Sequence, residues 1–200
     1  MNDKYRDCYE DLTIAAHRAY TRGMQTGSGG NLSVRIPGEE GMIVKSSGGS
    51  FADCDARGNG WIAMDFDGTL KEGEAGKPTR EWLLHSVLLE HLSGCNAVVH
   101  THSPYAIAWA DKHEDIPLVT WHSELKIGCA LPVFDVHAAV VPKEEAEEIL
   151  KKMQDNPNLP GVILKGHGLV VVGKSAVDAE HMAELVEETA QIAVLQNIIR

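Results

Sequence analysis

The chain has 200 residues, of which 44% are hydrophobic, and 29 acidic against 18 basic side chains give it a net charge of −11. This length favours a single domain over residues 1–200, and the acidic balance argues against a protein that binds DNA or RNA, which needs a basic face. No apolar stretch approaches the roughly 20 residues that span a bilayer, so no membrane segment is expected.

Four scattered cysteines and a charged amino terminus indicate the compartment. Cys8, Cys54, Cys95 and Cys129 form neither a C-x-x-C motif nor a short disulfide-like spacing, which is typical of a reducing environment. The amino-terminal sequence MNDKYRDCYEDL lacks the apolar core of a secretory signal. We therefore expect a cytoplasmic protein.

The first third of the chain predicts one helix followed by short strands. Helical spacing over 3–23 is carried by Tyr5, Cys8, Leu12, Ala15, Ala16 and Ala19. After the break TGSGGN, the alternation in 32–36 and the apolar run 42–45 predict a hairpin across the turn PGEEG. A glycine-serine loop, SSGGS, follows, and 60–68 is typical of another strand.

The middle of the chain predicts a helix, a buried strand and a second helix. Helical spacing returns over 78–92, with Thr79 as the expected N-cap. Residues 97–102, AVVHTH, indicate a buried strand. Ser103 and Pro104 then supply an N-cap and a proline at the first helical position, which together start a short helix.

The last third predicts strands and two longer helices. A strand is expected at 131–134, and a helix begins after Pro142 with glutamates in its first turns and ends near Lys152, a charge order that suits its dipole. GVILKGHGLVVVG indicates two strands around a Gly-His-Gly turn. The segment 175–178, SAVD, is a capping box that opens the final helix.

This order of elements predicts an α/β fold in three layers, α/β/α, around a central mixed, mostly antiparallel sheet. Several strands are joined by hairpins, whereas a Rossmann fold joins its strands by helical crossovers. The loop GSGGN also does not match G-x-G-x-x-G between a strand and a helix. A dinucleotide site is therefore not expected.

Three histidines stand out as candidate metal ligands. His100 and His102 lie two apart at the end of a strand, so their side chains point to one face and can bind one metal ion. Two ordinary histidines would show the same spacing. His167 lies between two glycines at a strand junction, where Asn or Asp is the commoner turn residue. Three neutral imidazoles with an open position form the ligand set of a catalytic zinc site.

A carboxylate and two loops complete the candidate residues. Glu81 is expected in the first turn of the 78–92 helix, where the helix dipole alone would favour a carboxylate. The loops 27–33 and 45–50 offer successive backbone N–H groups and small hydroxyls. Such loops can hold a phosphate or carboxylate, and they can equally be flexible turns.

Taken together, the motifs GNLSVR, SSG, KPTRE, VHTHS and GHGL, in this order, resemble the class II aldolase/adducin family over about residues 8–197. The resemblance implies the class II aldolase fold and a divalent metal, typically zinc, although manganese or cobalt can take its place, held by His100, His102 and His167. It implies that Glu81 is the catalytic acid/base beside the metal. It also implies a cyclic homotetramer with active sites between subunits.

The resemblance further implies a pocket for the substrate phosphate, formed by Ser28, Gly29, Asn31, Ser47, Gly48 and Thr79. Two positions depart from the pattern of the aldolases in this family. Arg80 replaces a serine, and could bind a phosphate or a substrate carboxylate, or lie on the surface. The region VTWHSELKIG lacks the tyrosine that those aldolases use as a proton donor. Glu124 is the nearest catalytic candidate there, and His122 the next.

The leading hypothesis is a zinc-dependent lyase that cleaves a sugar phosphate by a retro-aldol reaction to dihydroxyacetone phosphate and an aldehyde. The alternatives keep the metal site: a dehydratase of the methylthioribulose-phosphate type, which Glu124 favours, a decarboxylase, which Arg80 favours, or a 4-epimerase. A non-catalytic interaction module, as in the adducin head, is a third hypothesis. A scaffold has no chemical reason to keep three histidines and Glu81.

Overall fold

The structure, a computed structural model, describes residues 3–199. Its elements in chain order are η1 (Asp3–Tyr5), α1 (Arg6–Thr21), β1 (Asn31–Arg35), β2 (Met42–Lys45), η2 (Phe51–Asp53), β3 (Trp61–Met64), α2 (Trp82–His91), β4 (Ala97–Thr101), α3 (Pro104–Ala110), β5 (Asp115–Ile116), α4 (Trp121–Lys126), β6 (Leu131–Phe134), α5 (Lys143–Asp155), β7 (Gly161–Leu164), β8 (Gly168–Gly173) and α6 (Ala176–Ile199).

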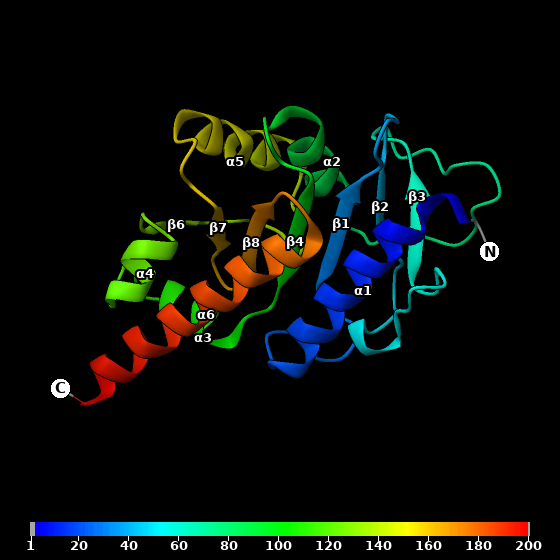
Figure 1. The fold of residues 1–200 in the computed structure, drawn as a ribbon. Coiled ribbons are helices and arrows are strands. Elements are labelled where there is room, and N and C mark those ends of the chain that lie inside the picture. Colours follow the sequence, from blue (N-terminus) through cyan, green and yellow to red (C-terminus); the bar gives the residue numbers. More distant parts are fainter. Residues whose placement is uncertain (1–2, 200) are drawn as a thin grey trace.

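Within these residues the strands form one eight-stranded sheet in the order β3-β2-β1-β4-β8-β7-β6-β5 (Figure 1). The strands β6 and β7 run parallel, whereas the other neighbours in residues 3–199 run antiparallel. The predicted hairpin β1–β2 is present, as is the hairpin β7–β8 around His167. The prediction of a mixed, mostly antiparallel sheet is confirmed.

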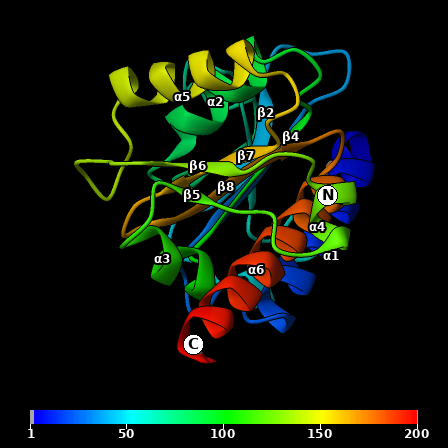
Figure 2. The same cartoon turned by 90° about the vertical axis from the view of Figure 1, so that its left-hand side faces the viewer.

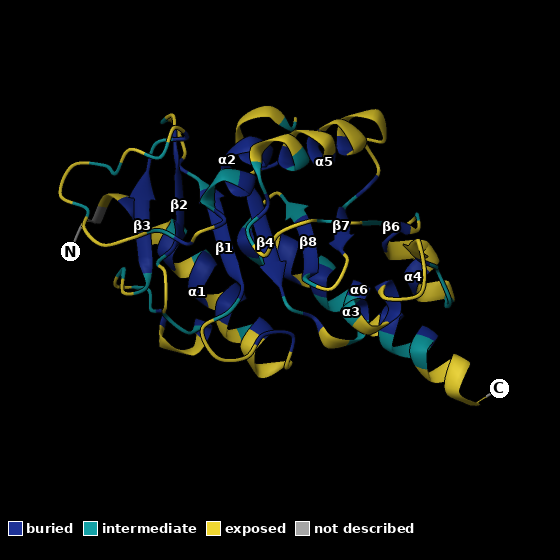
Figure 3. Cartoon of the chain, turned by 180° about the vertical axis from the view of Figure 1, so that it is seen from behind, coloured by how far each residue is buried: buried dark blue, intermediate teal, exposed yellow. Residues whose placement is uncertain are grey.

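Helices cover both faces of this sheet. In Figure 2 the sheet lies between α2 and α5 on one side and α1, α3 and α6 on the other. Each side has its own hydrophobic core, and Leu88 and Ile149 belong to the first, whereas Leu12 and Ala183 belong to the second. Figure 3 shows the central strands of the sheet mostly buried and the last turns of α6 exposed. The predicted three-layer arrangement is confirmed.

The alternation of side chains along β4 decides which layer His100 faces. Ala97 and Val99 pack in the core beneath α1, α3 and α6, whereas Val98 packs in the core beneath α2 and α5. Because strand side chains alternate, His100 faces the same side as Val98. The His100 ring therefore points toward the layer that contains α2.

The start of α2 differs from the sequence prediction. The helix begins at Trp82, with Glu81 at the N-cap position, so Thr79 is not its N-cap and Glu81 is not in its first turn. Thr79 N–H instead donates to Lys45 O at 2.9 Å, and Pro78 pairs with Ser46 in a β-bridge. These contacts with the end of β2 hold the backbone extended and delay the helix.

The N-termini of α3 and α6 are capped partly by residues that are distant in sequence. Ser103 occupies the predicted N-cap of α3, but its hydroxyl bonds Thr101, and the Glu187 carboxylate accepts the N–H groups of Tyr105 and Ala106 at 2.9 Å. Burial raises the pKa of Glu187 above its usual value. The start of this helix is therefore held by α6.

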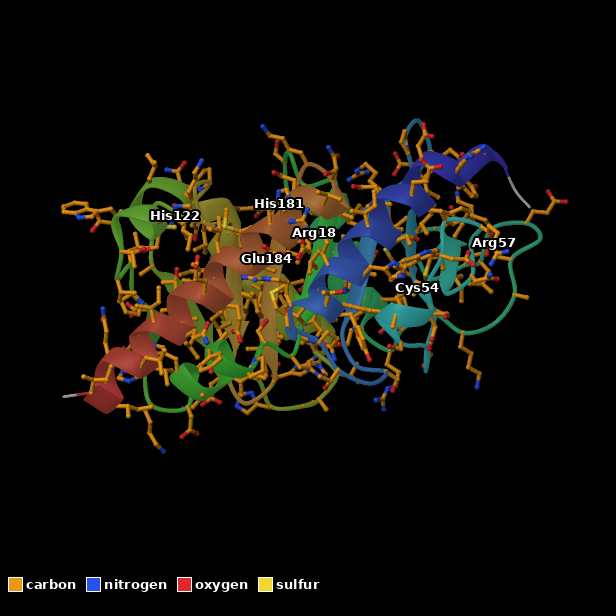
Figure 4. All side chains as sticks on the ribbon, turned by 60° about the horizontal axis from the view of Figure 1, so that its bottom comes forward. Arg18, Cys54, Arg57, His122, His181 and Glu184 are labelled. Atoms are coloured by element: carbon orange, nitrogen blue, oxygen red, sulfur yellow. The ribbon has the colours of Figure 1, made fainter. Side chains whose placement is uncertain are left out.

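At the predicted capping box of α6, Ser175 Oγ accepts the Asp178 N–H at 3.1 Å. The Asp178 carboxylate accepts from Lys174 N–H, so the reciprocal bond to Ser175 N–H is replaced by one from the preceding residue. Asp11 on α1 accepts the first two helical N–H groups of α6. Figure 4 shows Arg18 and Glu184 close together between α1 and α6, where Arg18 Nη2 lies 3.7 Å from Glu184 Oε1.

Other boundaries differ by a few residues. The predicted helix 3–23 divides into η1 and α1. The predicted strand 60–68 ends at Met64, because Asp65 N–H bonds Thr69 O and Gly68 turns back at a φ of 96°. The short elements β5 and α4 were not predicted. Within residues 3–199, no helix is both long and apolar enough to cross a membrane.

Candidate active site

A cavity of about 330 Å³ lies at the ends of central strands of the sheet, where β1 begins and β2 and β4 end. Its lining residues are Ser28, Gly29, Gly30, Asn31, Lys45, Ser47, Gly48, Thr79, Arg80, Glu81, His102, Ala139, Val140 and His167. Each residue that was predicted to contact substrate lies in this lining. The fold thus gathers segments that are more than a hundred positions apart in the sequence.

The three predicted histidine ligands meet beside this cavity. His100, His102 and His167 each offer one nitrogen, and these nitrogens lie within 4.8 Å of one another. The ring centroids of His100 and His167 are 4.7 Å apart, and those of His100 and His102 are 5.1 Å apart. His100 is fully buried, whereas the other two are half-buried and border the cavity.

The hydrogen bonding of His100 fits a metal ligand. Its Nδ1 lies 3.1 Å from Leu169 O, a backbone carbonyl that can only accept, so Nδ1 carries the proton. Its Nε2 therefore holds a free lone pair, and this atom has no hydrogen-bond partner among the residues that the structure describes. Metal-binding histidines commonly donate their second nitrogen to a carbonyl in this way.

The surroundings of His100 and His102 favour the uncharged form of these two imidazoles. Burial, followed by the neighbouring His167 and His102, lowers the pKa of His100 well below its usual value. Burial, followed by His167, also lowers the pKa of His102, although Glu81 opposes the shift. Neutral imidazoles are the form that binds a cation, and with the nitrogen of His167 within 4.8 Å of theirs the cluster fits a divalent ion such as zinc.

Glu81 lies against the histidine cluster. Its Oε2 is 3.3 Å from His100 Nε2 and accepts a hydrogen bond from Asn31 Nδ2 at 2.9 Å. Its Oε1 is 3.6 Å from His167 Nε2 and has no hydrogen-bond partner among the described residues. The residue Glu81 is 7% exposed and lines the cavity. It can therefore exchange a proton with a bound molecule or approach a metal ion.

The glycines near the histidines are required by close packing. A Cβ atom on Gly30, whose φ is 60°, would lie 2.9 Å from His100 O and closer still to the Gln25 side chain. A Cβ atom on Gly168 would also collide with Thr101 O. The buried Gln25 accepts the His102 N–H at 2.9 Å. The loop before β1 thus packs directly on the histidine pair, a role that its glycine-serine composition did not reveal.

Lys45 is a buried cation that the sequence analysis did not single out. It ends β2, is 2% exposed, and its Nζ donates to Ser28 O at 3.3 Å and to Ser46 O at 3.4 Å. No carboxylate of residues 3–199 pairs with it. Burial lowers its pKa. A lysine that ends an otherwise apolar strand directly before SSGG was the available sequence signal.

Arg80 and Lys45 make the cavity locally positive in an acidic protein. Arg80 is exposed and lines the cavity beside Thr79 and Glu81. This position allows Arg80 to bind either of the two anions considered for it, a phosphate or a substrate carboxylate. With Lys45 and the N–H groups of the loops 27–33 and 45–50, it provides the chemistry that binds a phosphate or carboxylate.

Glu124 and His122, the two candidates from the region without tyrosine, lie elsewhere in this chain. Both are exposed on α4, and neither is part of the cavity lining. Figure 4 labels His122 on α4, far from Cys54 and Arg57 at the other end of the molecule. In this chain the cavity is therefore built without them.

The chain is similar in sequence to known proteins. The family model described as class II aldolase and adducin N-terminal domain matches residues 10–194. The chain is 32% identical over 186 residues to L-fuculose phosphate aldolase of Methanocaldococcus jannaschii, covering 92% of this chain and 93% of the relative. It is 29% identical over 194 residues to 3-oxo-tetronate 4-phosphate decarboxylase of Escherichia coli, covering 92% and 84%.

A solved structure supports the same fold. The crystal structure of L-fuculose-1-phosphate aldolase from Thermus thermophilus superposes with a TM-score of 0.81 at 20% identity, covering 96% of this chain and 94% of that one. At this identity the likeness concerns the fold alone. The family match spans most of the chain, and the predicted resemblance is confirmed: the chain belongs to the class II aldolase and adducin family.

Proposed function

We propose that the protein is a metal-dependent lyase that cleaves a sugar phosphate by a retro-aldol reaction to dihydroxyacetone phosphate and an aldehyde. The observation that carries the proposal is the cluster of His100, His102 and His167 with Glu81 against it, at the wall of a cavity that also contains a buried lysine. The similarity to a fuculose phosphate aldolase supports this choice.

In this proposal the loops and Lys45 hold the substrate phosphate, and the reacting carbons lie toward the histidines. A divalent ion such as Zn²⁺, bound by the three histidines, would supply Lewis-acid polarisation of the substrate carbonyl. During cleavage the Glu81 carboxylate accepts the proton of the substrate hydroxyl that becomes the aldehyde, the carbon–carbon bond breaks, and its electron pair stays with the ketose fragment. Glu81 Oε1 then delivers a proton to that carbon.

A decarboxylase is the second candidate, and Arg80 is the observation that favours it. A guanidinium can bind a substrate carboxylate bidentately, and Arg80 borders Glu81 in the cavity. Loss of carbon dioxide also leaves an electron pair on carbon, which Glu81 could protonate in the same way. A relative is named as a decarboxylase of a sugar-acid phosphate. The two reactions differ in the leaving fragment.

We also propose that the protein is a cytoplasmic homotetramer in which α4 packs against a neighbouring subunit. Trp121 and Leu125 on α4 are 87% and 79% exposed, and exposed apolar side chains of this size are typical of interfaces. Glu124 lies between them on the same short helix. In the assembly Glu124 could therefore reach the cavity of the neighbour as a second proton carrier.

The reaction is tested by a panel of ketose 1-phosphates and sugar-acid phosphates, with products identified by mass spectrometry. We expect release of a triose phosphate from a ketose 1-phosphate. Loss of carbon dioxide would establish the decarboxylase instead, loss of water a dehydratase, and a change of stereochemistry at constant mass an epimerase. The double variant His100→Ala/His102→Ala is the control, and turnover that it retains would not belong to this site.

Replacing Lys45 with methionine tests the phosphate pocket. We expect KM for the phosphorylated substrate to rise about 10- to 100-fold with little change in kcat, because a charged hydrogen bond is worth about 1.5–3 kcal/mol. Burial lowers the pKa of Lys45, so this side chain loses its charge at a lower pH than an ordinary lysine does. The wild-type KM should therefore begin to rise at a lower pH than it would with a lysine of ordinary pKa in this position. Steady-state kinetics and calorimetric binding of inorganic phosphate measure both effects.

Lys143→Met is the matched control, because Lys143 is exposed on α5 and pairs with Glu147. It should leave KM and phosphate binding unchanged. If Lys45→Met binds phosphate as tightly as the wild type does, the anion is held elsewhere.

A further inference from the structure

Behind Glu81 runs a chain of buried hydrogen bonds that the proposed reaction does not use. Asn31 Nδ2 donates to Glu81 Oε2 at 2.9 Å, Asn31 Oδ1 bonds His85 Nε2, and His85 Nδ1 lies 2.6 Å from Ser33 Oγ. Asn31, Ser33 and His85 are 3%, 0% and 0% exposed. The chain thus links a residue in the cavity to two residues inside the protein.

The geometry of two elements produces this chain. Glu81 and His85 are four residues apart at the start of α2, so they lie on the same face of the helix. Asn31 and Ser33 are two apart on β1, so they lie on the same face of the strand. Leu32 and Val34 point into the core beneath α1, which leaves Asn31 and Ser33 facing α2.

The proton positions along this chain follow from the chemistry of its ends. A carboxylate accepts, so Asn31 must turn its NH₂ group toward Glu81 and its Oδ1 toward His85. His85 Nε2 must then carry a proton to donate to Oδ1. Burial lowers the pKa of His85 to about 3, so the ring is neutral and Nδ1 is an acceptor. Ser33 Oγ–H therefore donates to Nδ1, and each link has one direction.

We infer that His85 is a positioning residue for Glu81. By donating to Asn31 Oδ1, it holds the Asn31 amide in the one orientation that presents N–H to Glu81 Oε2. This bond fixes the plane of the carboxylate and leaves Oε1, beside His167, as the oxygen that faces the reaction. The inference rests on the proposed role of Glu81 as the proton carrier.

Without the His85 donor, the Asn31 amide can rotate by half a turn and place Oδ1 against the carboxylate. Two oxygens that only accept would then face one another in a buried site, which is unfavourable, and Glu81 would move. If the network only stabilised the protein, the activity of a variant would not depend on whether residue 85 still donates from the position of Nε2.

The test compares His85→Leu with His85→Gln. His85→Leu removes the donor, and we expect kcat to fall about 10- to 100-fold, the usual range for a residue that supports a site through another, with metal content unchanged. His85→Gln keeps an N–H near the position of Nε2, and its kcat should stay within about threefold of the wild type. Equal losses in the two variants, or full activity in His85→Leu, would overturn the inference.

Ser86→Ala is the matched control. Ser86 is the next residue of α2 and is also buried. Its hydroxyl donates to Phe66 O, which is not part of the hydrogen bonds that link Glu81 to Ser33. It should lower the free energy of unfolding without changing kcat. If kcat in the four proteins instead follows their stability, His85 is a structural residue and the inference is wrong.

The tautomer of His85 gives a readout that needs no substrate. In ¹⁵N-labelled wild-type protein at neutral pH, the imidazole spectrum should show His85 neutral with its proton on Nε2. A proton on Nδ1 would overturn the inference even if turnover is observed. If no substrate of the panel reacts but the Nε2–H tautomer is found, the proposed reaction is wrong, whereas the inferred direction of the hydrogen bonds from Ser33 to Glu81 is supported. The spectrum and His85→Gln keep the test valid if His85→Leu does not fold.

Discussion

Replacing His100 and His102 together with alanine is expected to abolish metal binding and to lower turnover by about 10³-fold or more. The loss is large because a Lewis-acid metal supplies several kcal/mol of transition-state stabilisation, and each 1.4 kcal/mol is about tenfold in rate. The protein keeps His167 alone, and one imidazole cannot retain the ion. Metal analysis of protein purified without a histidine tag, together with kcat, measures the effect.

The matched control is His91→Ala, because His91 is exposed at the end of α2 and away from the cavity lining. It should keep about one divalent ion per chain. Added Zn²⁺ should raise the unfolding temperature of the wild type and of His91→Ala, since a ligand at a thousand times its Kd stabilises by about 4 kcal/mol. Full metal content in the double variant would end the ligand assignment.

The second large effect is expected for Glu81→Gln, which should lower kcat about 10²- to 10⁴-fold while the metal content stays near that of the wild type. Positioned proton transfer contributes a factor of this size. Glutamine keeps the shape of the side chain, and its oxygen can still accept from Asn31. It cannot carry a proton to carbon. Steady-state kinetics and metal analysis on the same sample measure both quantities.

Glu90→Gln, on the exposed end of α2, is the matched control and should be fully active. Loss of metal in Glu81→Gln would show that the carboxylate is a ligand that the site cannot lose. Retained turnover would show that another group moves the proton, and Glu124 of a neighbouring subunit would be examined next.

The sequence predicted those parts of the fold that depend on local patterns. The hairpin β1–β2 and the turn around His167 follow from short apolar runs and from turn residues, and both are present. The predicted start of α2 was wrong, because Thr79 and Pro78 pair with the end of β2. No pattern within 78–92 reveals this pairing. The helix α4 has too few turns for a periodic signal.

The residues of the candidate site likewise fall into those that a local pattern reveals and those that it does not. His100 and His102 were visible because a strand places alternate residues on one face, and His167 because histidine is unusual in such a turn. Lys45, Gln25 and His85 were not singled out, since their roles depend on contacts between elements. His85 in particular looks like one more member of the run WLLHSVLLEHL until α2 is packed on β1.

The place of His100 in the sheet has a consequence for how the metal is exchanged. His100 lies on β4, opposite Asn31 of β1 on one side and Val170 of β8 on the other. Fraying of an edge strand such as β3 or β5 leaves these ladders intact, because local opening involves mainly weakly held edges. These ladders therefore keep His100 in place without metal, while the hydrogen bond from His102 N–H to Gln25 and the β7–β8 hairpin hold His102 and His167 beside it. Unlike a zinc finger, which must fold around its ion, this chain would take up metal by simple association with a preformed site.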